Sequence, residues 1–180
     1  MSEFEEKTVK SERIFDGNVI QVDVETVEVM DHRLQQRELV RHHGAVCMLP
    51  ITDDGRIILV RQYRKALESD LWEIPAGKIE PGETNLEKVA ARELEEEIKC
   101  QAHLEKIMTF YPSPGFSSEA LTLFLATDLR YLPQAKPRDV DEFMEVRALT
   151  LEEIAHLLEH EKIDGKTIIA LQYYQLKLRS

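Results

Sequence analysis

The chain has 180 residues, of which 43% are hydrophobic and 32% charged, the size and composition of a globular domain with room for a small second one. Its 34 Asp and Glu against 23 Lys and Arg give a net charge of −11, the wrong sign for holding nucleic acid through phosphates. No apolar run reaches the roughly 20 residues of a membrane-spanning helix. The N-terminus is charged and lacks the apolar segment of a secretory signal, so we expect a soluble, cytoplasmic protein that binds neither nucleic acid nor membranes.

The first zone of the chain, from about residue 5 to 41, alternates apolar and polar side chains, as in Val22, Val24 and Thr26. This period of two predicts antiparallel strands with one face in water. The alternation stops near His42–Gly44. We therefore expect a small β-domain over 1–41 and a second domain over 42–180.

The second zone predicts mixed strands and helices. Two apolar runs, 45–51 and 57–60, flank a turn at 53–56 and predict a buried hairpin. Thr84 and Glu87 have the spacing of a capping box and predict the start of a helix over about 85–98. Further strands are expected near 106–111, 120–127 and 143–146, and further helices over 151–160, with Thr150 as N-cap, and 166–178. This order indicates an α+β or layered α/β/α domain.

The two cysteines, Cys47 and Cys100, lie in different predicted elements without CxxC spacing. This argues against a disulfide framework and against a zinc site. We expect both to be reduced thiols that act as small apolar side chains.

The helix over 85–98 places acidic residues on its apolar face. At about 100° per residue, its apolar side chains share one arc, Glu93 and Glu97 fall in the middle of that arc, and Glu96 lies at its edge. Arg92 points about 100° away from Glu93 and is expected to compensate these charges poorly. Two carboxylates on a buried face need a positive partner, and oxygen ligands favour Mg²⁺ or Mn²⁺ over zinc. A solvated helix with i, i+4 ion pairs is the alternative.

The segment directly before this helix strengthens the metal-site interpretation. Residues 77–83 read Gly-Lys-Ile-Glu-Pro-Gly-Glu, a turn-forming loop that can bring backbone carbonyls near an ion or a phosphate. The run from Gly77 to Cys100 resembles the Nudix box: Gly, five residues, Glu, seven residues, Arg-Glu-apolar, one residue, Glu-Glu, one residue, Gly and an apolar residue. Gly77, Glu83, 92–94 and 96–97 occupy the key positions.

The run departs from the box pattern in two places. Eight residues, not seven, separate Glu83 from Arg92, and Lys99 replaces the second Gly. The extra residue lies upstream of Arg92, so the spacing among the acidic positions is kept. Lys99 is expected at a left-handed position after the helix, at a cost on the order of 1 kcal/mol.

The resemblance extends over nearly the whole chain and is strongest to the ADP-ribose pyrophosphatase branch of the family. Pro114, downstream of the box, is the feature that separates ADP-sugar hydrolases from other members. The segments that resemble this branch are Phe4–Thr8, Arg37–Val40, His43–Val46, Arg61–Arg64, Glu73–Gly77 and Ser113–Phe116. The resemblance implies an α+β fold, a Nudix α/β/α sandwich with a mixed sheet plus the N-terminal antiparallel β-domain. It also implies a homodimer in which that domain is exchanged toward the partner's site.

The resemblance further implies roles for individual residues. Glu93 and Glu97 would be direct ligands of Mg²⁺, for which Mn²⁺ is a possible substitute, with Glu96 as a ligand or an indirect partner and the Ala76 carbonyl as a further ligand. Arg92 would orient the glutamates. The general base would be Glu142, with Asp141 as the second candidate.

For the substrate, the resemblance implies that Arg64 contacts a phosphate or ribose, that Arg37 contacts the adenine side, and that Glu73 holds the terminal ribose or lines the dimer interface. Gly77 and the Ser113, Pro114 and Gly115 segment complete the expected binding residues. The implied reaction is Mg²⁺-dependent hydrolysis of ADP-ribose to AMP and ribose 5-phosphate. Two alternatives remain: hydrolysis of another nucleoside diphosphate derivative, and a non-catalytic module that senses a nucleotide.

Overall fold

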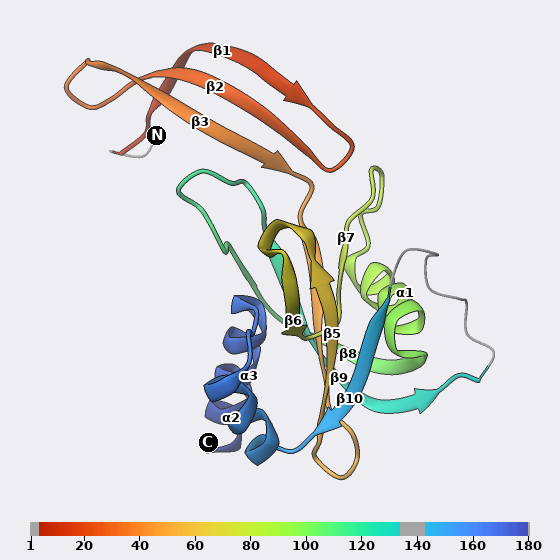
Figure 1. Ribbon diagram of the computed structural model, residues 1–180. Coiled ribbons are helices and arrows are strands. Elements are labelled where there is room, and N and C mark those ends of the chain that lie inside the picture. Colours follow the sequence, from red (N-terminus) through yellow and green to blue (C-terminus); the bar gives the residue numbers. More distant parts are fainter. Residues whose placement is uncertain (1–3, 134–142, 180) are drawn as a thin grey trace. The chain divides into compact units, whose positions relative to one another are not determined.

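The computed structural model describes residues 4–133 and 143–179 and divides the chain into two compact units (Figure 1). The first unit contains residues 1–44 and 111–120, and the second contains 45–110 and 121–180. Within the described residues, no helix is long and apolar enough to cross a membrane.

The first unit is built on a three-stranded antiparallel sheet, as the alternation of residues 5–41 predicts. Its strands are β1 (Lys7–Asp16), β2 (Ile20–Glu28) and β3 (Leu34–His42), in the order β1-β2-β3. The segment 111–120 belongs to the same unit because it pairs with the end of β3. Val40 N–H donates to the Phe116 carbonyl at 2.7 Å, and Ser118 N–H donates to the Val40 carbonyl at 2.9 Å.

One face of this sheet carries a buried charge, whereas the alternation of the strands predicts a polar face in water. Asp23, in the middle of β2, is only 6% exposed and accepts hydrogen bonds from Arg13 on β1 and Arg41 on β3. The hydrogen bond from Arg13 lowers the pKa of the Asp23 carboxyl, burial opposes this, and Arg41 adds to the lowering. Ion pairs across three strands therefore stabilise this face.

The second unit contains two sheets with helices on both sides. The order β7-β4-β9-β8 forms a mixed sheet in which only β4 and β9 run parallel, and β10-β5-β6 is antiparallel. The strands are β4 (Ala45–Pro50), β5 (Ile57–Arg64), β6 (Ser69–Glu73), β7 (Ala76–Lys78), β8 (Cys100–Phe110), β9 (Leu121–Tyr131) and β10 (Met144–Leu149), with the 3₁₀ turn η1 (Lys65–Leu67). The helices are α1 (Leu86–Ile98), α2 (Leu151–His160) and α3 (Gly165–Leu178).

The predicted hairpin of β4 and β5 is wrong in part. The turn forms, with Thr52 N–H bonded to the Arg56 carbonyl, and a single bridge joins Ile51 to Ile57. Beyond that bridge the two strands separate into different sheets. An apolar run cannot say which of several neighbours a buried strand pairs with.

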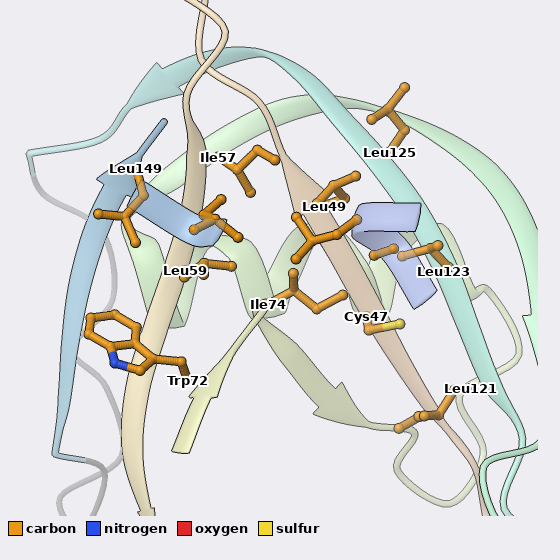
Figure 2. Packing of buried hydrophobic residues seen from close by; sticks show 14 residues of the cluster. Cys47, Leu49, Ile57, Leu59, Trp72, Ile74, Leu121, Leu123, Leu125 and Leu149 are labelled. Carbon is orange, nitrogen blue, oxygen red and sulfur yellow. The ribbon is translucent and has the colours of Figure 1, made fainter. Parts of the chain in front are cut away.

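Strand β4 lies between two apolar layers. Val46 and Met48 pack in the cluster on the α1 side, while Cys47 and Leu49 pack in the cluster formed with α2 and α3. Figure 2 shows the second cluster, in which Cys47 and Leu49 lie near Leu123 of β9. The α/β/α arrangement predicted for this part of the chain is therefore confirmed.

The helix ends agree with the sequence except at the start of α1. Thr150 caps α2 in a capping box with Glu153, as predicted. The predicted capping box of Thr84 and Glu87 is wrong, because the N-cap of α1 is Asn85, whose Oδ1 accepts from Lys88 N–H at 3.0 Å. Asn is as good an N-cap as Thr, so the two adjacent candidates compete. Lys99 ends α1 in the left-handed conformation, with φ 58°, as expected.

Candidate active site

Helix α1 and strand β7 meet at Gly77. A side-chain carbon at residue 77 would lie 1.8 Å from Cδ and 2.0 Å from Oε1 of Glu93, closer than any real contact. The absence of a side chain on Gly77 is thus what lets the Glu93 carboxylate lie against the backbone of β7. Two positions of the Nudix-like run, sixteen residues apart in sequence, are in direct contact.

Arg92 pairs with the acidic residues around it, which corrects the expectation that it points away from them. Its Nη1 lies 2.8 Å from Glu93 Oε1 and 3.0 Å from Glu96 Oε2, and its Nη2 lies 3.5 Å from Glu83. A helical wheel places Cβ atoms only, and the long Arg side chain spans the missing angle. Burial alone would lower the pKa of Arg92, but the charge of Glu93, the hydrogen bond to Glu96 and the charge of Glu83 outweigh it and raise that pKa.

Glu97 binds the same strand, β7. It is only 4% exposed, and its Oε2 accepts a hydrogen bond from Ala76 N–H at 3.1 Å. The backbone of Ala76, whose carbonyl is an expected ligand, is therefore held by an expected ligand carboxylate.

These side chains have donor chemistry that fits a divalent cation. Glu93 and Glu96 converge on one nitrogen, Nη1 of Arg92, so their oxygens can bracket a single positive charge. Oxygen donors of this kind suit Mg²⁺ or Mn²⁺. Across 4–133 and 143–179, no three His, Cys, Asp or Glu side chains are already grouped around one ion position. In the structure, the guanidinium of Arg92 is the cation between these two glutamates.

Arg64 and Glu73 form a bidentate pair at the ends of β5 and β6. Arg64 donates from Nε and Nη2 to the two oxygens of Glu73, at 2.6 and 2.7 Å. The Glu73 carboxylate is fully buried and also accepts from Lys166 Nζ at 2.5 Å. The bond to Glu73 raises the pKa of Arg64 against the opposing effect of burial, and the charges of Glu73, Asp164 and Glu97 add to the rise. Arg64 thus lies within electrostatic reach of a carboxylate of the α1 group.

The other arginines singled out in the sequence form ion pairs of their own. Arg61 pairs with Asp70 at 3.0 Å, with its guanidinium 6.0 Å from the centre of the Trp72 ring. Arg41 pairs with Asp23 and Glu25 in the first unit.

Four of the expected substrate-binding residues belong to the first unit. Arg37, on β3, pairs with Glu6 through Nε at 2.8 Å and through Nη2. The Ser113 carbonyl accepts from Phe116 N–H and Ser117 N–H and closes the turn that contains Pro114 and Gly115. The structure therefore presents these residues in one strand and one turn of a single unit.

The expected general base, Glu142, and its alternative, Asp141, lie outside the described residues. The described chain resumes at Phe143, directly before β10.

Sequence reasoning missed the residues that surround Glu73. Lys166 and Asp164 begin α3, where Asp164 Oδ1 caps the helix by accepting from Lys166 N–H and its Oδ2 accepts from Lys166 Nζ at 2.9 Å. Thr167, also fully buried, accepts from Ile74 N–H at 2.8 Å. An Asp at a helix start is an ordinary cap signal, and nothing in the sequence indicates that Lys166, two residues after it, is buried.

Comparison with known proteins gives this arrangement a context. The model of the NUDIX domain family matches residues 41–171. The chain is 49% identical over 179 residues to an ADP-ribose pyrophosphatase of Bacillus subtilis (strain 168), covering 98% of this chain and 96% of the relative. It is 44% identical over 177 residues to a methanol dehydrogenase activator of Bacillus methanolicus, covering 97% and 95%.

A solved structure shares the fold. It is a crystal structure of an ADP compounds hydrolase, which superposes with a TM-score of 0.85 at 24% identity and covers 99% of this chain and 97% of that one. At this identity the likeness establishes the fold alone.

Proposed function

The chain belongs to the Nudix family, and from this we propose that it hydrolyses the pyrophosphate bond of ADP-ribose to AMP and ribose 5-phosphate with Mg²⁺ as its metal. The observation that carries the proposal is the convergence of Glu93 and Glu96 on one cation position beside Gly77, with Glu97 held on Ala76. The 49% identity to a protein named ADP-ribose pyrophosphatase, over almost the whole chain, supports the choice of substrate.

The proposed metal ligands are Glu93, Glu96, Glu97 and the carbonyl of Ala76. A bound Mg²⁺, or Mn²⁺ in its place, would activate water and neutralise the leaving phosphate. The residues of the chain prepare this site: Gly77 leaves space for Glu93, the Ala76 amide orients Glu97, and Arg92 holds the glutamates until an ion replaces it. A carboxylate at Glu142, or at Asp141, would take the proton of the attacking water.

The proposed substrate contacts are cationic or backbone groups. Arg64 would meet a phosphate or ribose through the part of its guanidinium that does not face Glu73, and Arg37 would meet the adenine side. Ser113, Pro114 and Gly115 would form the turn that favours ADP-sugars. Because Glu73 is fully buried under Arg64 and Lys166, we propose that it acts on the substrate through Arg64.

We also propose that the protein is a cytoplasmic homodimer in which the N-terminal β-domain reaches the partner's site. The support is that four large apolar side chains of β1 and β3 are each more than half exposed: Val9, Ile14, Phe15 and Leu34. Contact with a second copy of the chain would remove their apolar surface from water. The replacement of Ile14 and Phe15 by Glu should halve the mass measured by light scattering, whereas a wild-type protein of 20.9 kDa in solution would contradict the dimer.

A substrate panel tests the reaction. AMP release from ADP-ribose, other ADP-sugars and nucleoside triphosphates, at matched Mg²⁺ and Mn²⁺, should give the highest kcat/KM for ADP-ribose. A triphosphate at the top of the panel would contradict the proposed substrate.

One substitution separates an enzyme from a sensing module. Glu97→Gln keeps an oxygen for the Ala76 amide but removes the negative charge, so kcat should fall about 100-fold with little change in stability. Glu87→Gln, an exposed carboxylate on the same helix, is the matched control and should retain full turnover. Equal turnover in Glu97→Gln and wild type would remove the proposed metal role.

A further inference from the structure

The guanidinium of Arg64 is held by only one of its edges. Both bonds to Glu73 use Nε and Nη2, so Nη1 takes no part in the pair. The Arg64 side chain is 42% exposed, while that of its partner Glu73 is fully buried. A planar guanidinium fixed along one edge by a buried carboxylate presents its other edge in a fixed direction.

The orientation of the Glu73 carboxylate depends in turn on Lys166. Oε2 of Glu73 accepts from Arg64 Nη2 and from Lys166 Nζ, and the Lys166 side chain is only 7% exposed. A carboxylate with a single partly exposed partner could rotate and carry the guanidinium with it. A second, buried cation on one of its oxygens fixes its plane.

The first turn of α3 holds Lys166 in place. Asp164 binds both the backbone N–H and the Nζ of Lys166, and Thr167 accepts from the amide of Ile74, the residue after Glu73. Asp164 N–H also donates to the Trp72 carbonyl, on the other side of Glu73. The start of α3 is therefore hydrogen-bonded to three consecutive residues at the end of β6 and directly after it: Trp72, Glu73 and Ile74.

Stability alone does not explain why these charged side chains are bonded to one another. A buried ion pair contributes little net stability, because desolvation of the charges offsets most of their attraction, and apolar side chains of similar size often do as well. The cluster of Arg64, Glu73, Lys166 and Asp164 carries two charges of each sign, and only Arg64 and Asp164 reach solvent to any extent. Its arrangement instead defines the position of one cationic group.

We propose that Lys166 is a positioning residue for the hydrolysis: through Glu73 it fixes the guanidinium of Arg64 so that Nη1 is directed to a phosphate oxygen of the substrate. The proposal rests on the proposed function for the identity of the anion. It assigns a task to the start of α3, which is distant in sequence from the Nudix-like run.

A double-mutant cycle tests the proposal. The variants are Lys166→Met, Arg64→Ala, the combination of both, and Lys166→Arg, with KM and kcat measured for ADP-ribose and Tm for each protein. Lys166→Met should raise KM about tenfold with a smaller change in kcat, and Lys166→Arg, which keeps the cation, should restore most of the loss. In the Arg64→Ala background the same Lys166→Met change should alter KM less than about twofold.

A purely structural role of Lys166 would give different results in this cycle. If Lys166→Met raises KM equally with and without Arg64, or lowers kcat alone in step with Tm, the proposal is overturned. If Lys166→Met does not fold, the double variant Glu73→Gln/Lys166→Met replaces it, because it leaves the net charge of the cluster unchanged. This double variant should raise KM as Arg64→Ala does. A wild-type KM in the double variant would also overturn the proposal. If the wild type does not hydrolyse ADP-ribose, the proposed function fails, and the cycle is read instead from the binding of inorganic pyrophosphate with Mg²⁺, where the same coupling is expected.

Discussion

Gly77 and Glu93 touch so closely that a methyl group on residue 77 would occupy the space of the Glu93 carboxylate, with 1.8 Å to Cδ and 2.3 Å to Cγ. In Gly77→Ala, Glu93 must therefore move away, because its flexible side chain yields more easily than the backbone of β7. We expect kcat to fall about 100-fold, as for the loss of a metal ligand, with a change in unfolding free energy below about 1 kcal/mol.

The control for this prediction is Gly165→Ala. Nothing lies within 4 Å of a side-chain carbon at residue 165, at the start of α3. Alanine there should leave activity unchanged and stabilise the protein by about 0.5–1 kcal/mol. Wild-type kcat in Gly77→Ala, measured beside this control, would refute the role of the contact.

Arg92 and a metal ion should compete for the same oxygens. In Arg92→Met, Glu93 and Glu96 lose the cation that lies between them, so the metal-free protein should be destabilised by about 1 kcal/mol. Mg²⁺ should then raise Tm by several degrees more in the variant than in wild type, because binding to the native state alone stabilises it. Thermal unfolding with EDTA and with Mg²⁺ measures the difference.

Lys88→Met provides the comparison for Arg92, since Lys88 is an exposed cation on the same helix. Its response to Mg²⁺ should match that of the wild type. Equal Mg²⁺ responses in Arg92→Met and Lys88→Met would show that Arg92 does not occupy the ion position.

The start of α1 can be assigned by two substitutions. Asn85→Ala removes the oxygen that accepts from Lys88 N–H and should cost about 1 kcal/mol of unfolding free energy. Thr84→Ala should cost a few tenths at most, because Thr84 lies outside the cap. Urea unfolding of both variants decides between them, and a larger loss in Thr84→Ala would restore the capping box that its spacing suggests.

The buried thiol of Cys47 should make stability depend on pH in the alkaline range. Burial raises the pKa of Cys47 from 9.0 to about 12, with the charge of Lys166 opposing the shift and that of Asp164 adding to it. Between these values the native state retains a proton that the unfolded chain has lost, so stability is complete below pH 9 and falls as pH rises toward about 12. The slope contributed by this group is at most about 1.4 kcal/mol per pH unit.

Cys47→Ala isolates this contribution. The variant should show a constant loss from the missing sulfur below pH 9 and a shallower decline above it. Parallel stability curves for wild type and variant across the alkaline range would contradict the raised pKa.

The sequence predicts the helices and strands, and which side chains share a helix face, better than it predicts which strands and side chains pair in space. The carboxylate positions on α1, the strands of residues 5–41 and the cap at Thr150 follow from periods and local hydrogen bonds that a few neighbouring residues determine. Strand pairing does not, and this is why the expected hairpin of β4 and β5 opens into two sheets. Pairing depends on which distant strands compete for the same edge.

The same limit applies to charged side chains. A helical wheel predicts that Arg92 compensates the glutamates poorly, because it ignores the reach of a long side chain, yet Arg92 pairs with three glutamates. Lys166 becomes buried only because α3 packs on the end of β6, a contact between residues 93 positions apart. Nothing local to Lys166 indicates this burial.

The first unit consists of two stretches of chain, 1–44 and 111–120, joined by the bonds of Val40 to Phe116 and Ser118. A chimera that grafts only the N-terminal stretch of a relative onto this chain would therefore import one stretch of the unit without the other and would mismatch the residues that bond the two together. Exchange of specificity between relatives by recombination is expected to succeed when both stretches travel together, even though most of the intervening gene stays behind.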